Sequence, residues 1–471
     1  MKSFSRLPAL AAFFTFSLSG LALAASSEAW PTWRGAAGTG SVAGAKPPVK
    51  WSDTENIKWK AEVPGLGFST PIVWQDRIYL LTAIETTEED PAAKSAAAAA
   101  PTPPPPPPKG GDVKGGDGKG RGGKRGGPGG GFGGGMKPTK YHEFVVLALD
   151  RSTGKTVWQK TARREVPHEG KHGTNSFASA SPTTDGQHLY AFFGSRGLFC
   201  FDLQGNLKWE KDLGNMRTRG TFGEGASPAL AGDKLIVSWD HEDGSFIVAL
   251  DKKTGAEAWR KSRDEISNWS TPLIVEVDGK KQAIVAAARR TRSYDVATGE
   301  IVWEASGLTE NVIPTPVVGH GMVYVMSGFR GNSIQAIKLS SRGDVSETPN
   351  VVWSARKSAP YVPSPVLSGD RLYMGKSNDA FLSCLNALTG EVHYQDQRLE
   401  GVRGLYASPL AANGHVYVVG REGTVMVLKD APQFEVVATN QLSDKLDASP
   451  VIVGRELYLR GHKFLYCISE G

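Results

Sequence analysis

The segment His168 to His172, "HEGKH", has two histidines at the spacing that zinc proteases use for two metal ligands. That chemistry requires both histidines on one face of a helix, with the glutamate between them acting as general base. Here Pro167 precedes the segment, Gly170 lies inside it, and "GTNSF" follows it, so no helix is predicted. We therefore expect a loop without a metal ion at this position.

Polar residues suited to binding concentrate in a few connecting segments rather than in one catalytic motif. The longest are "HEGKHGTNSFA" (168–178), "GNMRTRGTFGEGA" (214–226) and "RDEISNW" (263–269), and the shorter ones include "WDHEDGS", "AARRT" and "GFRG". No Ser/His/Asp arrangement or nucleophile elbow stands out, so we expect no catalytic residue. The candidate ligand- or partner-binding residues are His172, Asn175, Arg217, Arg219, Glu224, Asp240, His241, Trp269, Arg290 and Arg330.

Arg217 and Arg219 lie close to a Gly-rich turn and to Glu224. A pair of guanidinium groups suits a carboxylate, phosphate or sulfated ligand, because each can bind two oxygens at once. An Arg–Glu network within the protein is the alternative for the same three residues.

These loops must be held by a repeated unit. The pattern [Ser/Thr]-Pro, a Gly turn and an apolar run occurs eight times, and from the second copy onward its prolines are 46, 44, 44, 49, 44 and 41 residues apart. The prolines are Pro71, Pro182, Pro228, Pro272, Pro316, Pro365, Pro409 and Pro450. A period of about 40–50 residues is the size of one propeller blade. Each unit contains four short strands, A to D, so the sequence predicts an all-β, eight-bladed β-propeller.

The two ends of the chain are predicted to close this ring. The eighth unit ends at "KFLYCISEG" and has no fourth strand, while "NIKWKAE" (56–62) resembles the fourth strand "NLKWEKD" (206–212). We therefore expect the N-terminal strand to complete the last blade, which leaves no open sheet edge at the seam.

The connections between strands C and D carry a turn motif, as in "ALDKKTGAEAW" (249–259). Asp can bond its own backbone and Gly accepts a positive φ, so Asp-x-x-Thr-Gly suits a tight turn. An aromatic residue then follows on strand D in seven of the eight units, and we expect these rings to wedge between neighbouring blades. They are Trp59, Trp158, Trp209, Trp259, Trp303, Trp353 and Tyr394.

These repeats resemble those of the pyrroloquinoline quinone (PQQ)-like β-propeller proteins, over nearly all of residues 30–471. That family includes the quinoprotein alcohol dehydrogenases, the outer-membrane assembly factor BamB and secreted bacterial propellers that open with a segment like "WPTWRG" (30–35). The resemblance implies the fold, but a propeller supports many functions. Quinoprotein dehydrogenases carry a vicinal disulfide under the cofactor and a carboxylate/amide set for calcium.

This sequence has three cysteines, Cys200, Cys384 and Cys467, and no Cys-Cys pair. Each replaces the Ala of "ALD", so the three occupy equivalent sites on different blades and are too far apart to bridge. No calcium set can be placed. We therefore expect no cofactor, with PQQ and calcium as the alternative.

The first 24 residues read as a cleaved signal peptide, and residues 25–55 as an N-terminal segment before a propeller at 56–471. No lipidated Cys follows the cleavage site, and no window predicts a transmembrane helix. A periplasmic or secreted protein, peripheral to the membrane at most and monomeric, is expected.

A Pro/Gly-rich insertion, predicted to be disordered, occupies residues 85–141 inside the first blade. Residues 109–140 contain eight Lys/Arg and two Asp, a net charge of +6 that equals the formal charge of the whole chain. Export makes nucleic acid an unsuitable target, so an envelope protein or an anionic envelope polymer is the expected partner.

The sequence thus predicts a non-catalytic binding or scaffold propeller of the bacterial envelope. The alternatives are a PQQ-dependent dehydrogenase and a polysaccharide-binding accessory protein.

Overall fold

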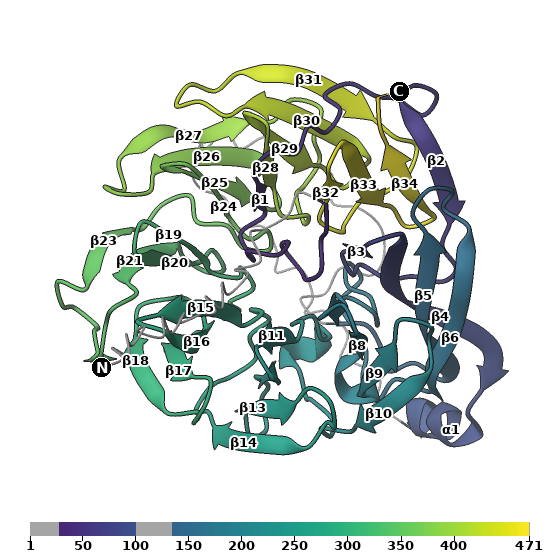
Figure 1. Ribbon diagram of the computed structural model, residues 1–471. Coiled ribbons are helices and arrows are strands. Elements are labelled where there is room, and N and C mark those ends of the chain that lie inside the picture. The colour runs from purple at the N-terminus through teal and green to yellow at the C-terminus, as the bar shows by residue number, and fades with distance from the viewer. Residues whose placement is uncertain (1–27, 100–133, 471) are drawn as a thin grey trace, which may run out of the picture.

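In the computed structural model, which describes residues 28–99 and 134–470, the strands form eight sheets arranged around one axis (Figure 1). Each sheet is an antiparallel blade of four strands, and two blades carry a short parallel fifth strand. The predicted all-β eight-bladed propeller is confirmed. We number the blades along the chain and give their strands from the axis outward.

The strands of blades 1 to 4 follow the chain in order. Blade 1 contains β3 (Ile72–Trp74), β4 (Arg77–Glu89), β5 (Lys140–Asp150) and β6 (Thr156–Glu165); blade 2 contains β7 (Thr183–Thr184), β8 (His188–Phe192), β9 (Leu198–Asp202) and β10 (Leu207–Lys211); blade 3 contains β11 (Ala229–Ala231), β12 (Lys234–Trp239), β13 (Phe246–Asp251) and β14 (Glu257–Ser262); blade 4 contains β15 (Leu273–Val277), β16 (Lys280–Val285), β17 (Thr291–Asp295), β18 (Ile301–Ala305) and β22 (Gly343–Asp344).

Blades 5 to 8 complete the circle, and two N-terminal strands join the last two. Blade 5 contains β19 (Val317–Gly319), β20 (Met322–Ser327), β21 (Ser333–Lys338) and β23 (Val351–Ala355); blade 6 contains β24 (Val366–Ser368), β25 (Arg371–Lys376), β26 (Phe381–Asn386) and β27 (Val392–Arg398); blade 7 contains β1 (Ser41–Val42), β28 (Leu410–Ala412), β29 (His415–Val419), β30 (Thr424–Lys429) and β31 (Val436–Gln441); blade 8 contains β32 (Val451–Val453), β33 (Glu456–Arg460), β34 (Phe464–Ile468) and β2 (Ile57–Glu62).

The second and third strands of each blade form the core. In blade 1, for example, β4 and β5 bury continuous apolar runs, whereas the outer strand β6 is mostly exposed. A blade is covered on both sides by its neighbours, so its central strands need apolar residues at consecutive positions rather than at alternate ones. The outer strands face solvent.

The turn chemistry of the C–D hairpins is as predicted. In blade 1, Oδ1 of Asp150 accepts hydrogen bonds from the backbone N–H groups of Ser152 (3.1 Å) and Thr153 (2.9 Å). Gly154 then adopts a φ of 72°, which a residue with a side chain rarely tolerates. The motif therefore specifies the turn without any ligand.

Most of the strand-D tryptophans reach across to the C–D turn of the next blade. Their indole N–H groups donate to backbone carbonyls there, and the ring lies over the turn glycine. The pairs are Trp59 with Arg151 (3.0 Å), Trp158 with Leu203 (3.1 Å), Trp209 with Lys252 (3.1 Å), Trp259 with Val296 (2.9 Å) and Trp353 with Ala387 (2.8 Å). Tyr394 instead meets Phe434 of the next blade edge-on, and Trp303 is fully buried. The rings thus lie at the junctions between blades.

The N-terminal strand closes the ring as predicted. Strand β2 pairs antiparallel with β34, with Trp59 opposite Cys467. Across the same seam, Arg151 of blade 1 donates from Nε to Glu456 of blade 8 at 2.8 Å. Arg460 of blade 8, fully buried, donates to the backbone oxygen of Ser69 at 2.9 Å. The first and last blades are therefore joined by strand pairing and by two arginines.

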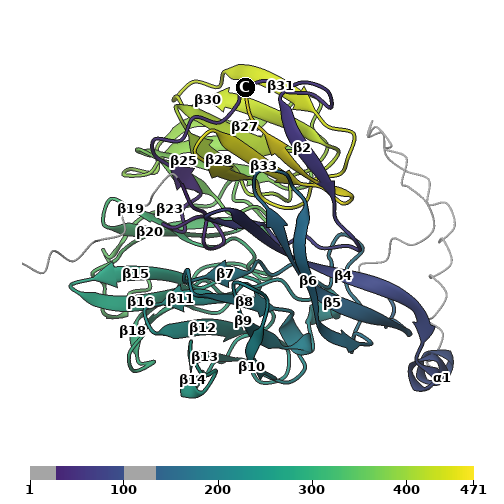
Figure 2. The ribbon, with the colours of Figure 1, turned by 45° about the vertical axis from the view of Figure 1, so that its right-hand side comes forward.

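The predicted limits of the insertion at 85–141 are too wide at both ends. Strand β4 continues to Glu89, β5 begins at Lys140, and helix α1 (Pro91–Ala99) follows β4. The two long strands pair beyond the ring and carry α1 at their tip (Figure 2). Hydrogen bonding between β4 and β5 continues through a polar stretch, whose residues lack the apolar pattern that predicts a strand. The remainder of the predicted insertion, 100–133, lies outside the described residues.

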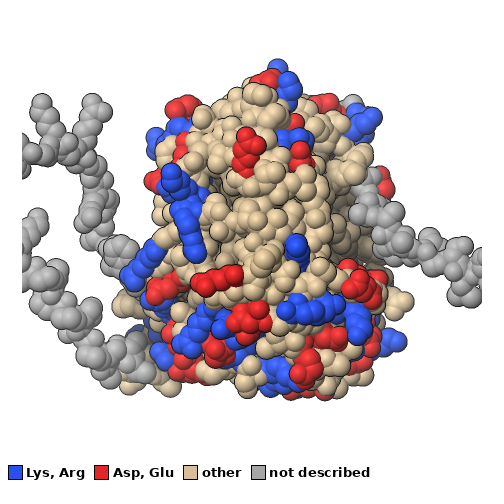
Figure 3. Space-filling view, turned by 90° about the vertical axis from the view of Figure 1, so that its left-hand side faces the viewer, with Lys and Arg blue, Asp and Glu red and all other residues tan. Residues whose placement is uncertain are grey.

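The described part of the chain is electrically balanced. Residues 100–133 carry six Lys/Arg and two Asp, and residues 1–27 carry two further basic residues, so the described residues have a formal net charge of zero. The side of the ring seen in Figure 3 shows acidic and basic side chains intermingled. None of the helices in the described residues is long and apolar enough to cross a membrane.

Candidate ligand-binding cavity and polar loop face

The [Ser/Thr]-Pro motif builds a ring of hydroxyl groups around the axis. In seven of the eight junctions of the described propeller, the backbone N–H of the Ser or Thr donates to the hydroxyl of its counterpart in the next blade, at 2.9–3.2 Å. The ring consists of Thr70, Ser181, Ser227, Thr271, Thr315, Ser364, Ser408 and Ser449. The proline that follows each Ser or Thr has no N–H that needs a partner. Each motif therefore contributes one backbone N–H and one hydroxyl, both from the Ser or Thr, to link the blades.

Beside this ring lies a cavity of about 400 Å³. Seven of the eight ring residues line it, and so does the residue two positions before each ring residue. These second residues are Phe68, Ser179, Gly225, Trp269, Ile313, Val362, Tyr406 and Asp447. Two rings of residues therefore line the cavity. The constant ring is the Ser/Thr ring, and the variable ring consists of the residues two positions before it. The residues of the variable ring lie in the D–A loops, which connect the outermost strand of one blade to the innermost strand of the next. These loops emerge on the same face of the propeller as the B–C loops within each blade, so the cavity lies at that face.

Residues 30–42 cross the axis beside the cavity and contact blades far apart in the ring. Trp30 exchanges two backbone hydrogen bonds with Val73 of blade 1 (2.7 and 2.9 Å), and Trp33 lines the cavity. The guanidinium of Arg34 donates to the carbonyls of Pro409 (2.7 Å) and Pro365 (2.6 Å), in blades 7 and 6. Arg34 is only 3% exposed, and its burial lowers its pKa to about 9, so it is protonated at neutral pH.

The predicted boundary between an N-terminal segment at 25–55 and the propeller is therefore wrong for the described residues. Strand β1 of that segment pairs with β28, and Thr184 of blade 2 donates to the carbonyl of Pro31 at 2.9 Å. Residues of the "WPTWRG" segment thus pack into the axis of the propeller.

Glu224 stands between the axial cavity and a smaller cavity of about 50 Å³. Its carboxylate accepts hydrogen bonds from the backbone N–H (2.7 Å) and the hydroxyl of Ser195, which lies in a 3-10 turn, Gly194–Arg196. A Cβ on Gly194 would lie 1.3 Å from Oε2 of Glu224, so only glycine leaves room for the carboxyl group. Burial raises the pKa of Glu224 to about 7, against the bonds from Ser195.

This pKa predicts a pH dependence of stability that Glu224→Gln should remove. The folded state binds the proton more tightly than the unfolded chain, whose ordinary value is 4.5. The stabilisation is therefore complete below pH 4.5 and is lost as the pH rises through 7. Glutamine keeps the shape and can still bond Ser195. We expect equal stability at pH 4.5 and an advantage of the variant of up to about 3 kcal/mol at pH 8.

Urea unfolding of both proteins at pH 4.5, 6 and 8 measures this difference. Parallel stability profiles for the two proteins would show that folding does not raise the pKa of Glu224.

Of the ten candidate residues, four line the axial cavity: His172, Asn175, Glu224 and Trp269. Nδ2 of Asn175 donates to the carbonyls of Phe222 (2.9 Å) and Glu224 (3.2 Å), which holds this part of the wall. Nδ1 of His172 lies 2.7 Å from the hydroxyl of Thr174, which in turn donates to the hydroxyl of Tyr406 at 3.0 Å. The loop between blades 1 and 2 is thus tied to the loop between blades 6 and 7.

Arg217 and Arg219 do not form the expected pair facing a ligand. Arg217 pairs with Asp243 through Nε and Nη2, each at 2.5 Å, and is 62% exposed at its side chain. Arg219 pairs with Glu310 at 3.0 Å, and the same carboxylate lies 3.8 Å from Arg330. Each arginine has an acidic partner on another loop, but neither pairs with Glu224, which bonds Ser195, so these three residues form no common Arg–Glu network.

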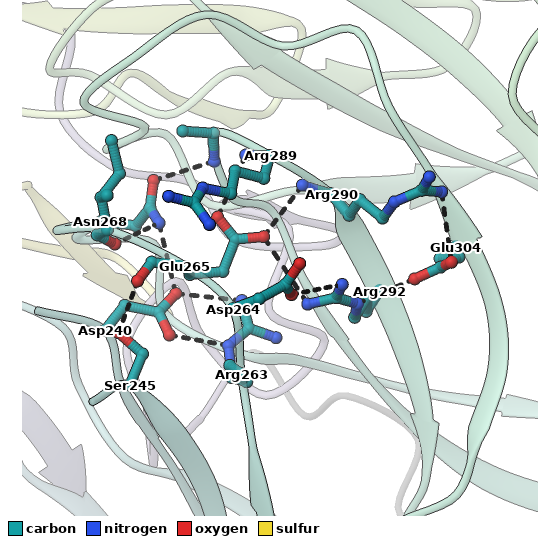
Figure 4. A network of polar contacts seen from close by, with 12 residues as sticks. Asp240, Ser245, Arg263, Asp264, Glu265, Asn268, Arg289, Arg290, Arg292 and Glu304 are labelled. Carbon is teal, nitrogen blue, oxygen red and sulfur yellow. Dashed lines mark hydrogen bonds and ion pairs between the residues drawn. The ribbon is translucent and has the colours of Figure 1, made fainter.

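Asp240, His241 and Arg290 belong to contacts that hold the loops of blades 3 and 4. Nδ1 of His241 accepts a hydrogen bond from the backbone N–H of Arg217 at 3.2 Å. Asp240 forms a buried bidentate pair with Arg263 (2.7 and 3.0 Å). Glu265 accepts the backbone N–H groups of Arg289 (3.0 Å) and Arg290 (2.9 Å), as Figure 4 shows.

The outer part of the same network reaches solvent. Arg292 pairs with Asp264 at 2.6 Å and with Glu304 at 2.9 Å (Figure 4). Arg290 bridges Glu304 and Asp344. Charge on these loops is therefore matched within blades 3 to 5.

The "HEGKH" segment is a loop, as predicted. His168 contacts the backbone oxygen of Met216 through Nε2 at 2.6 Å, and its partner His172 faces Thr174. Among the described residues, no group of three or more His, Cys, Asp or Glu side chains is placed to hold a metal ion.

The most informative signal that sequence reasoning missed is the position two residues before each [Ser/Thr]-Pro. Its members differ in chemistry, from Phe68 to Gly225 to Asp447, so they form no recognisable motif. The spacing to the proline would have identified them. Phe222, Phe329 and Tyr361 also line the cavity, and no periodicity marks them.

The residues at the axis do not fit PQQ, the cofactor that the resemblance to quinoprotein dehydrogenases implies. PQQ is a tricarboxylate, and the described lining of the cavity contains no Lys or Arg to match it. The three cysteines are free and buried in blades 2, 6 and 8, so none of them supplies a disulfide beneath a cofactor.

Solved structures match the fold at low sequence identity. The chain is similar to BamB from Moraxella catarrhalis, with a TM-score of 0.52, 16% identity, and coverage of 69% of this chain and 91% of that one. It is also similar to the quinohemoprotein alcohol dehydrogenase of Comamonas testosteroni, with a TM-score of 0.58, 9% identity, and coverage of 95% and 81%. Both likenesses concern the fold alone.

Curated relatives align over a part of their length. "Outer membrane protein assembly factor BamB" of Bordetella pertussis is 26% identical over 178 residues, 37% of this chain and 41% of that protein. The protein of the same name from Francisella salina is 27% identical over 128 residues, 25% and 23% of the two chains. The family model described as "Outer membrane protein assembly factor BamB" matches residues 142–306 and 242–470. The chain therefore belongs to this family of PQQ-repeat β-propellers.

Proposed function

We propose that the protein is an exported, non-catalytic scaffold of the bacterial envelope, which binds envelope proteins through its D–A and B–C loops. As its family's name indicates, assembly of outer membrane proteins is the process it would serve. The observation that carries the proposal is the way these loops are anchored. Buried and half-buried carboxylates hold their backbones: buried Glu265 binds two N–H groups, and half-buried Glu169 accepts the N–H of Thr218 at 3.2 Å.

Anchored loops favour a partner-binding surface, because little conformational freedom is lost when a second protein docks. The loop face also presents charged groups whose partners are themselves exposed, such as Arg217 with Asp243 and Arg330 with Glu310. Exposed pairs of this kind add little stability, so they are free to exchange partners. On the opposite face, the C–D turns are short Asp-Gly elements that offer few side chains.

The basic segment at 100–133 suggests a second contact. Its six Lys/Arg and two Asp suit an anionic polymer of the envelope, whose attraction would weaken with added salt. This contact would supplement the docking of a protein on the loop face.

A complementation experiment in the native host tests the proposed role. Deleting the gene is expected to lower the amount of folded outer-membrane β-barrel proteins, measured by heat-modifiable mobility on gels, and the wild-type gene should restore it. The double variant Arg217→Glu/Arg330→Glu, on the loop face, should restore less than about a third of the loss, because two attractive contacts become repulsive. The matched control Lys155→Glu/Lys253→Glu, on two exposed C–D turns, should restore it fully.

Normal β-barrel levels in the deletion strain would contradict the assembly role. Equal restoration by both double variants would contradict the choice of face. Dye-linked alcohol oxidation after addition of PQQ and calcium to the purified protein would instead establish the dehydrogenase alternative.

A further inference from the structure

The axial cavity has an aromatic wall. Seven of its described lining residues are aromatic: Trp33, Phe68, Phe222, Trp269, Phe329, Tyr361 and Tyr406. Several are held in place by their neighbours. The indole N–H of Trp269 donates to the carbonyl of Gly223 at 2.6 Å, and Phe329 and Tyr361 stack with ring centroids 5.1 Å apart. Rings fixed in this way offer flat apolar faces to a ligand without a further loss of side-chain freedom.

The same cavity offers hydrogen-bonding groups that the fold leaves partly unused. Six lining hydroxyls accept a backbone N–H, and none of them donates a hydrogen bond to another described residue; they are those of Ser181, Ser227, Thr271, Ser364, Ser408 and Ser449. A hydroxyl has one proton and two lone pairs, so each can still donate to a ligand and accept from it. Asn378 adds an amide group to the lining, whereas the amide of Asn175 is occupied by hydrogen bonds within the protein.

The charges around the cavity argue against an ionic ligand. The described lining has no Lys or Arg, so an anion would lose its hydration without gaining a counter-charge. Of its two carboxylates, Asp447 is paired with Arg421 (2.6 Å) and His462 (2.9 Å). The other, Glu224, is occupied by Ser195. A volume of about 400 Å³ lies within the range of small-molecule sites, roughly 300–1,000 Å³.

We propose that this cavity binds a neutral saccharide of about two sugar units. The C–H faces of the sugar rings would lie against the aromatic wall, and their hydroxyls would exchange hydrogen bonds with the Ser/Thr ring and with Asn378. The variable ring would determine which saccharide binds best, because each blade contributes one residue of different chemistry to it. The inference goes beyond the scaffold role and rests on the cavity alone, since the charge variants of the docking test lie outside its lining.

Two glycine variants test the site while keeping the chemical change the same. Gly225 lines the cavity with an ordinary φ, and a Cβ there would lie 3.6 Å from Cδ1 of Trp269, a normal contact. Gly225→Leu should therefore fold and place a side chain in the cavity. Gly173 also has an ordinary φ, and a Cβ there would meet nothing within 4 Å. Gly173→Leu is the matched control on a neighbouring loop.

The measurement is titration calorimetry and intrinsic tryptophan fluorescence of the full-length protein. The probes are cellobiose, maltose and N,N′-diacetylchitobiose, with digalacturonate as an anionic probe and choline as a cationic one. We expect at least one neutral disaccharide to bind, Gly225→Leu to abolish this binding and Gly173→Leu to leave it unchanged. If Gly225→Leu does not fold, Tyr361→Ala replaces it, with about tenfold weaker binding expected from the loss of one stacking face.

The proposal is overturned if none of the neutral disaccharides binds, if only digalacturonate or choline binds, or if Gly225→Leu binds as tightly as the wild type. None of these results bears on the complementation experiment, so failure of the saccharide site and failure of the scaffold role remain distinguishable.

Discussion

Replacing Trp59 with alanine is expected to lower the free energy of unfolding by about 3–5 kcal/mol, the range for a large buried aromatic residue. The indole is 9% exposed and donates to the carbonyl of Arg151 at 3.0 Å. It lies over the turn glycine Gly154, where a Cβ would come within 2.5 Å of the ring. Its loss would open a cavity between blades 8 and 1 and leave the carbonyl without its partner.

Trp209→Ala is the matched control for this prediction. Trp209 makes the same two contacts at the junction of blades 2 and 3, with Lys252 and Gly255, where the chain itself runs from one blade to the next. At the seam, by contrast, an N-terminal strand joins the last blade to the first. We therefore expect Trp59→Ala to lose more stability and to broaden the transition, as measured by urea unfolding. Equal losses in both variants would show that the seam is no weaker than other junctions.

Asp240→Ala is expected to lower the free energy of unfolding by a similar amount, about 3–5 kcal/mol, because it strands a buried positive charge. The side chains of Asp240 and Arg263 are 1% and 0% exposed. Burial by itself would lower the pKa of Arg263, but attraction by Asp240 holds that pKa above its ordinary value. Without Asp240 this attraction is lost and the cost of burying the guanidinium is no longer offset, while the hydroxyl of Tyr294 at 2.6 Å remains as a neutral contact.

The control for this variant is Asp243→Ala, which makes the same substitution three residues away. Asp243 pairs with Arg217 at the surface, and little change in stability is expected there. Thermal and urea unfolding of the two variants measure the contrast. A small effect of Asp240→Ala would mean that Arg263 is solvated in solution, which the buried pair in Figure 4 does not allow.

The repeat made most of the fold predictable. Each [Ser/Thr]-Pro marked the start of a blade, and Trp59 in "NIKWKAE" matched its equivalent Trp209 in "NLKWEKD" closely enough to identify the closing strand. These signals are local, because the backbone chemistry of a turn or of a strand start depends on a few consecutive residues. They recur, so eight copies support one another.

The axial site depends on contacts that no local pattern records. Arg34 bonds carbonyls 331 and 375 residues further along the chain, and nothing near it in the sequence indicates those partners. Likewise, the sequence makes Arg217 a candidate for ligand binding, because nothing near it indicates that Asp243 is its partner. The fold brings Asp243 of another loop next to it. Glu224 was identified as a candidate, but the enclosure that raises its pKa comes from Gly194 and Ser195 of the neighbouring blade.

We propose that one face of the propeller, formed by D–A and B–C loops, binds proteins of the envelope. Site-specific photocrosslinking in living cells tests it most directly, with a photoreactive residue placed at Arg217 or Arg330 on this face, or at Lys155 or Lys253 on the C–D turns. We predict defined crosslinked envelope proteins from the first two positions and none from the second two. Crosslinks from the C–D turns alone, or from neither face, would contradict the claim.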